Sequence, residues 1–148
     1  MLPSSIPIPI PGGLHDPLPR FVKVGQEFDL SAISDINASV AQQFQRFADK
    51  DLTGKSIAIG IGSRGIKQQP QVVRALIQEL KTAGAKPFII PAMGSHGGGS
   101  AEGQAAVLAS YGYTEEGMGA PIRSSMEVVE LGRIERNVPV YCDKLAME

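Results

Sequence analysis

The chain has 148 residues, of which 43% are hydrophobic and 20% charged, as in an ordinary globular domain. Its 14 basic and 15 acidic residues nearly balance, so neither nucleic acid nor an anionic membrane is expected as a partner. No apolar run reaches the roughly 20 residues of a membrane-spanning helix. The single cysteine, Cys142, excludes an internal disulfide and suits a reducing compartment, so we expect a cytoplasmic protein.

Prolines concentrate at the beginning of the chain, where residues 1–19 hold six of the eleven. Each proline fixes φ and removes a backbone donor, so this segment is expected to form a proline-rich arm. Residues 20–148 are then expected to form a partial α/β domain. Alternating apolar residues predict a strand at 20–24, and apolar residues spaced by four and three predict a helix at 38–49.

The clearest unit follows in the middle of the sequence. The apolar run SIAIGI at 56–61 is typical of a strand buried on both faces. An amphipathic helix is predicted at 70–83, with Pro70 in its first turn and Gly84 at its C-terminal end. A second strand is predicted at 86–92. Strand, helix and strand with short connections indicate a βαβ unit, so the two strands should be parallel.

Weaker patterns continue to the end of the sequence. Ser100 is expected to cap a helix that runs to about Tyr111 and stops before Gly112. Further strands are predicted at 127–131 and 138–141. Together with the aliphatic core implied by the absence of tryptophan, these elements predict an α/β fold in which helices flank a mainly parallel sheet.

Two glycine-rich loops follow the two strands of the predicted βαβ unit, and both should emerge at the edge of the sheet where ligands bind. The first, GIGSRG at 60–65, matches the dinucleotide pattern GxGxxG. That pattern also needs an acidic residue about twenty positions later, and residues 83–93 contain none. An NAD site is therefore not favoured. Arg64 could hold a carboxylate or phosphate, or it could be solvated or paired with a surface acid.

The second loop, PAMGSHGGGSAEG at 91–103, surrounds one of the chain's two histidines, His96. A histidine followed by three glycines resembles an esterase oxyanion segment, but the sequence contains no GxSxG nucleophile. Two interpretations remain open. His96 could exchange protons near neutral pH, with Ser95 and a helix N-terminus beside it, or it could bond backbone carbonyls in a turn. No metal-ligand cluster is visible.

Several long motifs occur in an order that resembles a known family. They are GSRGI (62–66), PAMGSHGG (91–98), AEGQ (101–104) and APIRSSMEVVELGR (120–133). The sequence over about residues 15–146 is similar to the N-terminal region of the lactate racemase family, in particular to its nickel-dependent racemase-like relatives. The resemblance implies a Rossmann-like α/β domain facing a second domain, with a nickel-pincer nucleotide between them.

The resemblance also implies an activity, the racemisation or epimerisation of a small 2-hydroxy acid, which would make the protein an isomerase. His96 matches one of the family's two proton-transferring histidines, and Arg64 matches the arginine near the cofactor and the substrate carboxylate. Ser95 is expected to contact the substrate. The residues expected to contact the cofactor lie in the two loops: Ser63, Arg64, Gly97 and Gly98.

The sequence departs from the family pattern in two respects. Ile61 stands where the family's racemases carry an aspartate, and the second histidine and the cofactor-anchoring lysine would follow residue 148. The chain is therefore expected to be the first third of a longer enzyme, inactive and without cofactor until the C-terminal region joins it. A truncated sheet should expose an apolar edge, which favours a homodimer. The alternative function is a non-catalytic nucleotide- or phosphate-binding module.

Overall fold

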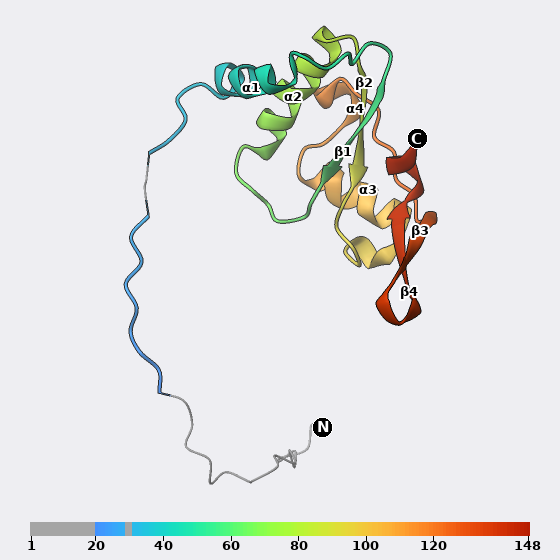
Figure 1. Cartoon of the computed structure of the whole chain (residues 1–148). Coiled ribbons are helices and arrows are strands. Elements are labelled where there is room, and N and C mark those ends of the chain that lie inside the picture. Colours follow the sequence, from blue (N-terminus) through green and yellow to red (C-terminus); the bar gives the residue numbers. More distant parts are fainter. Residues whose placement is uncertain (1–19, 29–30) are drawn as a thin grey trace. The chain divides into compact units, whose positions relative to one another are not determined.

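The computed structural model describes residues 20–28 and 31–148 (Figure 1). The chain divides into two units, Met1–Ala32 and Ile33–Glu148. In the first unit, residues 20–28 form no helix or strand, so the strand predicted at 20–24 is wrong. Its apolar side chains, including Phe21 and Val22, are exposed, and a strand needs a neighbouring strand to pair its backbone groups. The predicted arm at 1–19 lies outside the described residues.

The second unit begins with α1 (Ile36–Phe44), which continues into a 3-10 turn at Gln45–Phe47. A helix was predicted at 38–49. The structure confirms that this segment is helical, but the helix begins two residues earlier. Asp35 explains this start, because its Oδ1 accepts a hydrogen bond of 2.9 Å from the backbone nitrogen of Ala38 and so caps the first turn.

The central βαβ unit has the predicted arrangement. It consists of β1 (Ser56–Ile61), α2 (Gln69–Thr82) and β2 (Lys86–Pro91), and the strands pair in parallel from Ser56 opposite Lys86 to Ile61 opposite Pro91. Gly84 follows the end of α2 with a left-handed φ of +81°, and the next amide, that of Ala85, bonds back to the carbonyl of Leu80. This is the Schellman geometry that glycine permits.

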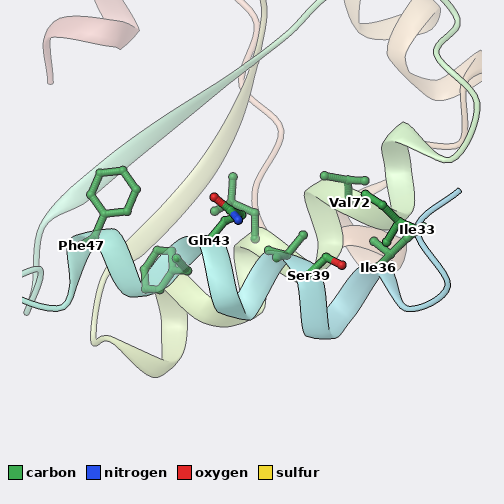
Figure 2. Close-up of a pocket in the computed structure, with 9 residues that line it drawn as sticks. Ile33, Ile36, Ser39, Gln43, Phe47 and Val72 are labelled. Carbon is green, nitrogen blue, oxygen red and sulfur yellow. The ribbon is translucent and has the colours of Figure 1, made fainter. Parts of the chain in front are cut away.

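The apolar residues of α2 divide between two neighbours. Val73, Ile77 and Leu80 are buried in the core, whereas Val72 and Leu76 face α1. An apolar cavity of about 350 Å³ lies between α1 and α2 and is lined also by Ile36, Phe44 and Phe47 among others; Figure 2 shows several of these side chains.

The two strands differ in burial. Every residue of β2 after Lys86 is buried, whereas Ile61 is the only buried residue of β1. The prediction that β1 is buried on both faces is therefore wrong. In the described part of the chain, β1 has a neighbour on one side only, whereas β2 lies between β1 and a bridge to Ile122. The amide of Ile89 bonds to the carbonyl of Pro121, and the amide of Arg123 bonds to that of Ile89.

The predicted helix after the second glycine-rich loop is confirmed as α3 (Ala101–Ser110). Ser100 caps it, because its Oγ accepts a hydrogen bond of 3.1 Å from the backbone nitrogen of Gly103. Gly112 follows its end with a left-handed φ of +85°. A further short helix, α4 (Glu115–Met118), was not predicted, because four residues are too few to show a helical period.

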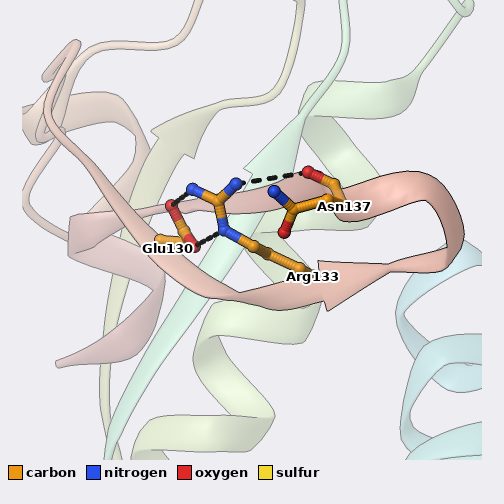
Figure 3. Close-up of polar contacts among 3 residues, drawn as sticks. All are labelled: Glu130, Arg133 and Asn137. Atoms are coloured by element: carbon orange, nitrogen blue, oxygen red, sulfur yellow. Dashed lines mark hydrogen bonds and ion pairs between the residues drawn. The ribbon is translucent and has the colours of Figure 1, made fainter.

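The last strands form a hairpin rather than part of the parallel sheet. β3 (Val128–Ile134) and β4 (Val138–Asp143) pair antiparallel. The guanidinium of Arg133 links β3 to the turn before β4, contacting both carboxylate oxygens of Glu130 at 2.9 and 3.3 Å and the carbonyl of Asn137 at 3.2 Å (Figure 3). The fold thus mixes helices and strands, and the parallel sheet in the described part of the chain has two strands.

The core lies where α2, β2, α3 and α4 meet. Ile77, Ile89, Leu108 and Tyr113 are almost completely buried there. The hydroxyl of Tyr113 has no hydrogen-bond partner among the described residues, and burial raises the pKa of Tyr113 above its ordinary value of 10.0. Among the described helices, none has both the length and the apolar character needed to cross a membrane.

Candidate functional site

A cavity of about 220 Å³ lies at the carboxyl ends of β1 and β2. The parallel register places Ile61 opposite Pro91, so the two glycine-rich loops leave the sheet side by side. The residues lining the cavity come from both loops: Gly62, Ser63, Arg64, Ala92, Met93 and His96. The structure therefore brings together three of the residues that the sequence singles out, Ser63, Arg64 and His96.

The imidazole of His96 is held by a contact that sequence reasoning did not anticipate. Its Nδ1 and the Oγ of Ser63 form a hydrogen bond across the two loops. The carbonyl of the same serine accepts a hydrogen bond of 3.2 Å from the hydroxyl of Tyr111, at the end of α3. The other ring nitrogen of His96, Nε2, has no hydrogen-bond partner among the described residues and is left for a ligand.

The backbone around His96 forms a turn, since the amide of His96 bonds to the carbonyl of Met93 and the amide of Gly99 bonds to that of His96, both at 3.3 Å. The interpretation of His96 as a turn residue is thus correct for its backbone. Its ring, however, bonds the hydroxyl of Ser63 rather than a backbone carbonyl. His96 is exposed and lines the cavity.

The loop that carries His96 packs directly on α3. Gly97 has a left-handed φ of +65°, and a Cβ at this position would lie 2.5 Å from the backbone nitrogen of Gln104. Only glycine permits this approach. The side chain of Gln104 is 6% exposed, and its Nε2 donates a hydrogen bond of 2.7 Å to the carbonyl of Gly94. The Oγ of Ser100 donates to the carbonyl of Gly97 at 3.2 Å. These contacts fix the loop on both sides of the imidazole.

Arg64 brings a positive charge to the same cavity. Its side chain is exposed, and it forms no ion pair or hydrogen bond with the residues that the structure describes. The alternative in which a surface acid pairs with Arg64 therefore finds no such acid in this part of the chain. A guanidinium offers five N–H donors in a planar fork, and these remain available to an anion.

The remaining predicted site residues are placed differently. Ser95 is exposed and does not line the cavity. Gly97 lies against the backbone of α3. Gly98 also has a left-handed φ, +69°, but a Cβ there would meet open space. Thus Ser63, and not Ser95, provides the hydroxyl beside the imidazole.

Sequence reasoning missed Gln104 and Tyr111. The only signal for Gln104 is a polar residue on the side of α3 that faces the preceding loop. Nothing in the sequence indicates the bond of Tyr111 to Ser63, because it depends on how the end of α3 approaches the first loop.

The structure offers no complete metal site of its own. Within residues 20–28 and 31–148, no group of three or more histidine, cysteine, aspartate or glutamate side chains is close enough to hold a metal ion. Cys142 is a partly buried free thiol on β4 and does not line the cavity at the ends of β1 and β2.

Comparisons with protein-family models, with curated proteins and with solved structures give no match to this chain.

Proposed function

We propose that the chain is the N-terminal, Rossmann-like α/β part of a nickel-pincer-nucleotide-dependent racemase or epimerase of 2-hydroxy acids. The proposal starts from the resemblance of the glycine-rich motifs to the lactate racemase family. The observation that supports it most is the single cavity lined by Ser63, Arg64 and His96. An anion-binding group and a proton-transferring group then lie at the ligand-binding edge of a parallel strand pair.

The cavity fits the small anionic parts of this chemistry. Its volume of about 220 Å³ is below the roughly 300–1,000 Å³ of sites that enclose drug-sized ligands, so it suits a small hydroxy acid or one phosphate group. The unpaired donors of Arg64 fit either anion. The described residues do not form a ligand set for nickel. They therefore fit the anionic portion of the nucleotide, and the metal must be held by other groups.

In this proposal, three residues of the chain have separate roles in substrate binding and proton transfer. Arg64 binds the substrate carboxylate through two N–H groups, which orients the hydroxyl on C2 toward His96. His96 accepts the hydroxyl proton of one enantiomer at Nε2 and returns it when that enantiomer re-forms, while the second histidine that the resemblance implies would serve the opposite enantiomer. Ser63 accepts a hydrogen bond from Nδ1–H, which keeps the lone pair on Nε2. The bound pincer nucleotide supplies the hydride acceptor for C2.

The test is a racemisation assay on the complete protein, expressed together with the enzymes that make the cofactor. Single enantiomers of several short 2-hydroxy acids are incubated with the purified protein, and the products are separated by chiral chromatography. Interconversion of at least one acid is expected, with none when the cofactor-making enzymes are omitted. A preparation that contains stoichiometric nickel-pincer nucleotide but racemises no 2-hydroxy acid would overturn the proposal.

A second candidate function is a non-catalytic phosphate-binding module. One observation favours it, namely that the unpaired guanidinium of Arg64 would serve a phosphate as well as a carboxylate. This module would bind a mononucleotide without metal, and His96→Ala would leave that affinity unchanged. If the chain binds a mononucleotide in this way and the loaded protein does not racemise any 2-hydroxy acid, the phosphate-binding function is supported and the racemase function is rejected.

A further inference from the structure

A second cavity, of about 400 Å³, lies at the amino ends of β1 and β2. Ser56 and Lys86, the first residues of these strands and register partners, both line it. Because a strand rises about 3.3 Å per residue, six residues place this cavity roughly 17 Å from the His96 cavity. We propose that it is a binding site for a phosphate-bearing small molecule, distinct from the racemase site.

The residues that line this cavity carry positive charge. Three cations from three segments meet there: Lys81 in the last turn of α2, Lys86 at the start of β2 and Arg123 just after the bridge at Ile122. None of the residues that line the cavity is acidic. Three like charges gathered at one cavity repel one another, and an anion that carries more than one negative charge relieves this repulsion.

Two of the three cations are held in place by the fold. The guanidinium carbon of Arg123 lies 4.7 Å from the ring centroid of Phe88, a ring that is itself 3% exposed and so is fixed in the core. The ammonium of Lys81 donates to the carbonyl of Gly119. A lysine has three N–H donors and an arginine five, so both groups retain donors. Binding then needs little further ordering of these side chains.

One carboxylate competes for this charge. Glu148 Oε2 lies 3.2 Å from Nη1 of Arg123, but both side chains are about half exposed, so the pair is weak. The neighbouring Glu115 is already engaged, because its Oε1 accepts the backbone N–H of Ile122 at 2.9 Å. The side chain of Lys86 forms no ion pair within the described part of the chain. A phosphate can therefore displace Glu148 and bind all three cations.

The volume and the lining of this cavity indicate which class of ligand it fits. A volume of about 400 Å³ falls within the range typical of small-molecule sites and leaves room beyond a single anionic group. Ala85, Pro87 and Pro121 add apolar atoms to the lining, against which the remainder of a phosphorylated molecule can lie. The hydroxyl of Ser56 adds a neutral donor that a tetrahedral phosphate can use.

The experiment titrates the 15N-labelled chain with inorganic pyrophosphate at constant ionic strength and follows backbone amide shifts by NMR. Saturable shifts are expected at Ser56, Lys86 and Arg123. Lys86→Gln should weaken binding about tenfold, as expected for one lost charge-assisted hydrogen bond. Glu148→Gln should strengthen it, because the competing carboxylate is removed. The control is Lys67→Gln, which removes an exposed lysine on the loop before α2 and should leave the affinity unchanged.

Several results would overturn the proposal. These are shifts that rise linearly without saturation, an equal loss of affinity in Lys67→Gln and Lys86→Gln, or equally tight binding of the dicarboxylate succinate. The spectrum of Lys86→Gln away from the mutation shows whether this variant is folded. The assay reads amides at the amino ends of the strands and uses no racemase activity, so its outcome is independent of the proposed function.

Discussion

The Oγ of Ser63 and the Nδ1 of His96 are hydrogen-bonded although the residues are 33 positions apart. This bond joins the loop after β1 to the loop after β2 at the edge formed by the carboxyl ends of the strands. It occupies one nitrogen of the imidazole and leaves Nε2 as the only ring atom that can exchange a proton with a ligand. The position of the ring proton therefore decides what His96 can do.

The first prediction concerns the tautomer of His96. As a base at Nε2, the neutral imidazole must carry its proton on Nδ1 and donate it to Ser63. The 15N shifts of the neutral ring should therefore show mainly the Nδ1–H form. Ser63→Ala removes the acceptor and should lose this preference, whereas Ser110→Ala, at the exposed end of α3, should keep it. A dominant Nε2–H form in the unsubstituted protein would contradict the role given to Ser63.

The second prediction separates two glycines of the same loop. Gly97 and Gly98 have nearly equal left-handed φ values, +65° and +69°, but only a Cβ at Gly97 would collide with the backbone of α3. Gly98→Ala should cost about 1–2 kcal/mol in the free energy of unfolding, from the left-handed backbone alone. Gly97→Ala adds the steric overlap and should cost about 2–5 kcal/mol. Urea unfolding measures both, and equal costs would show that the loop does not pack on α3 as described.

The third prediction compares two tyrosines near α3. Tyr113 is 1% exposed and its hydroxyl lacks a partner within the described residues, so Tyr113→Phe should stabilise the fold by about 1 kcal/mol. The hydroxyl of Tyr111 bonds the carbonyl of Ser63, so Tyr111→Phe should destabilise it by about 0.5–1.5 kcal/mol. Thermal and urea unfolding distinguish the two signs. Destabilisation by Tyr113→Phe would reveal a hydrogen bond to that hydroxyl.

The fourth prediction is that Tyr113 makes the stability of the fold depend on pH in the alkaline range. Burial raises the pKa of Tyr113 in the folded state above 10.0, so the folded chain retains this proton more tightly than the unfolded chain. The corresponding stabilisation is complete below pH 10 and is lost as the pH rises through the folded-state pKa. As the pH rises from 10 to the pKa of Tyr113 in the folded state, the free energy of unfolding should fall more in the unsubstituted protein than in Tyr113→Phe. Parallel stability curves for the two proteins above pH 10 would contradict this burial.

The features predicted correctly from the sequence are those set by local chemistry. Ser100 begins α3 because a serine hydroxyl can cap the amide three residues later, and Gly84 and Gly112 follow helix ends because glycine accepts a left-handed φ. The parallel pairing of β1 and β2 followed from the short strand–helix–strand connection. Both glycine-rich loops were therefore expected at one edge of the sheet.

The features that the sequence did not reveal depend on contacts between distant segments. The apolar residues of β1 indicated complete burial, but burial requires a neighbour on each side, and strand order is not encoded in a six-residue run. The pairing of β3 with β4 in a hairpin likewise depends on the turn between them. Ser95, next to His96 in the sequence, was expected at the substrate and Ser63 at the cofactor, and only the register of the strands brings Ser63 to the imidazole of His96.

The central claim is that His96 transfers the hydroxyl proton of a 2-hydroxy acid, and the rate of racemisation by the loaded, complete protein tests it most directly. General acid–base catalysis contributes about 100- to 10,000-fold, so His96→Ala should lower kcat at least about 100-fold, while Ser110→Ala should retain the unsubstituted rate. The cofactor content of each variant is measured so that a lower rate cannot be caused by lost cofactor. A fully loaded His96→Ala protein that racemises the substrate at nearly the unsubstituted rate would contradict the account.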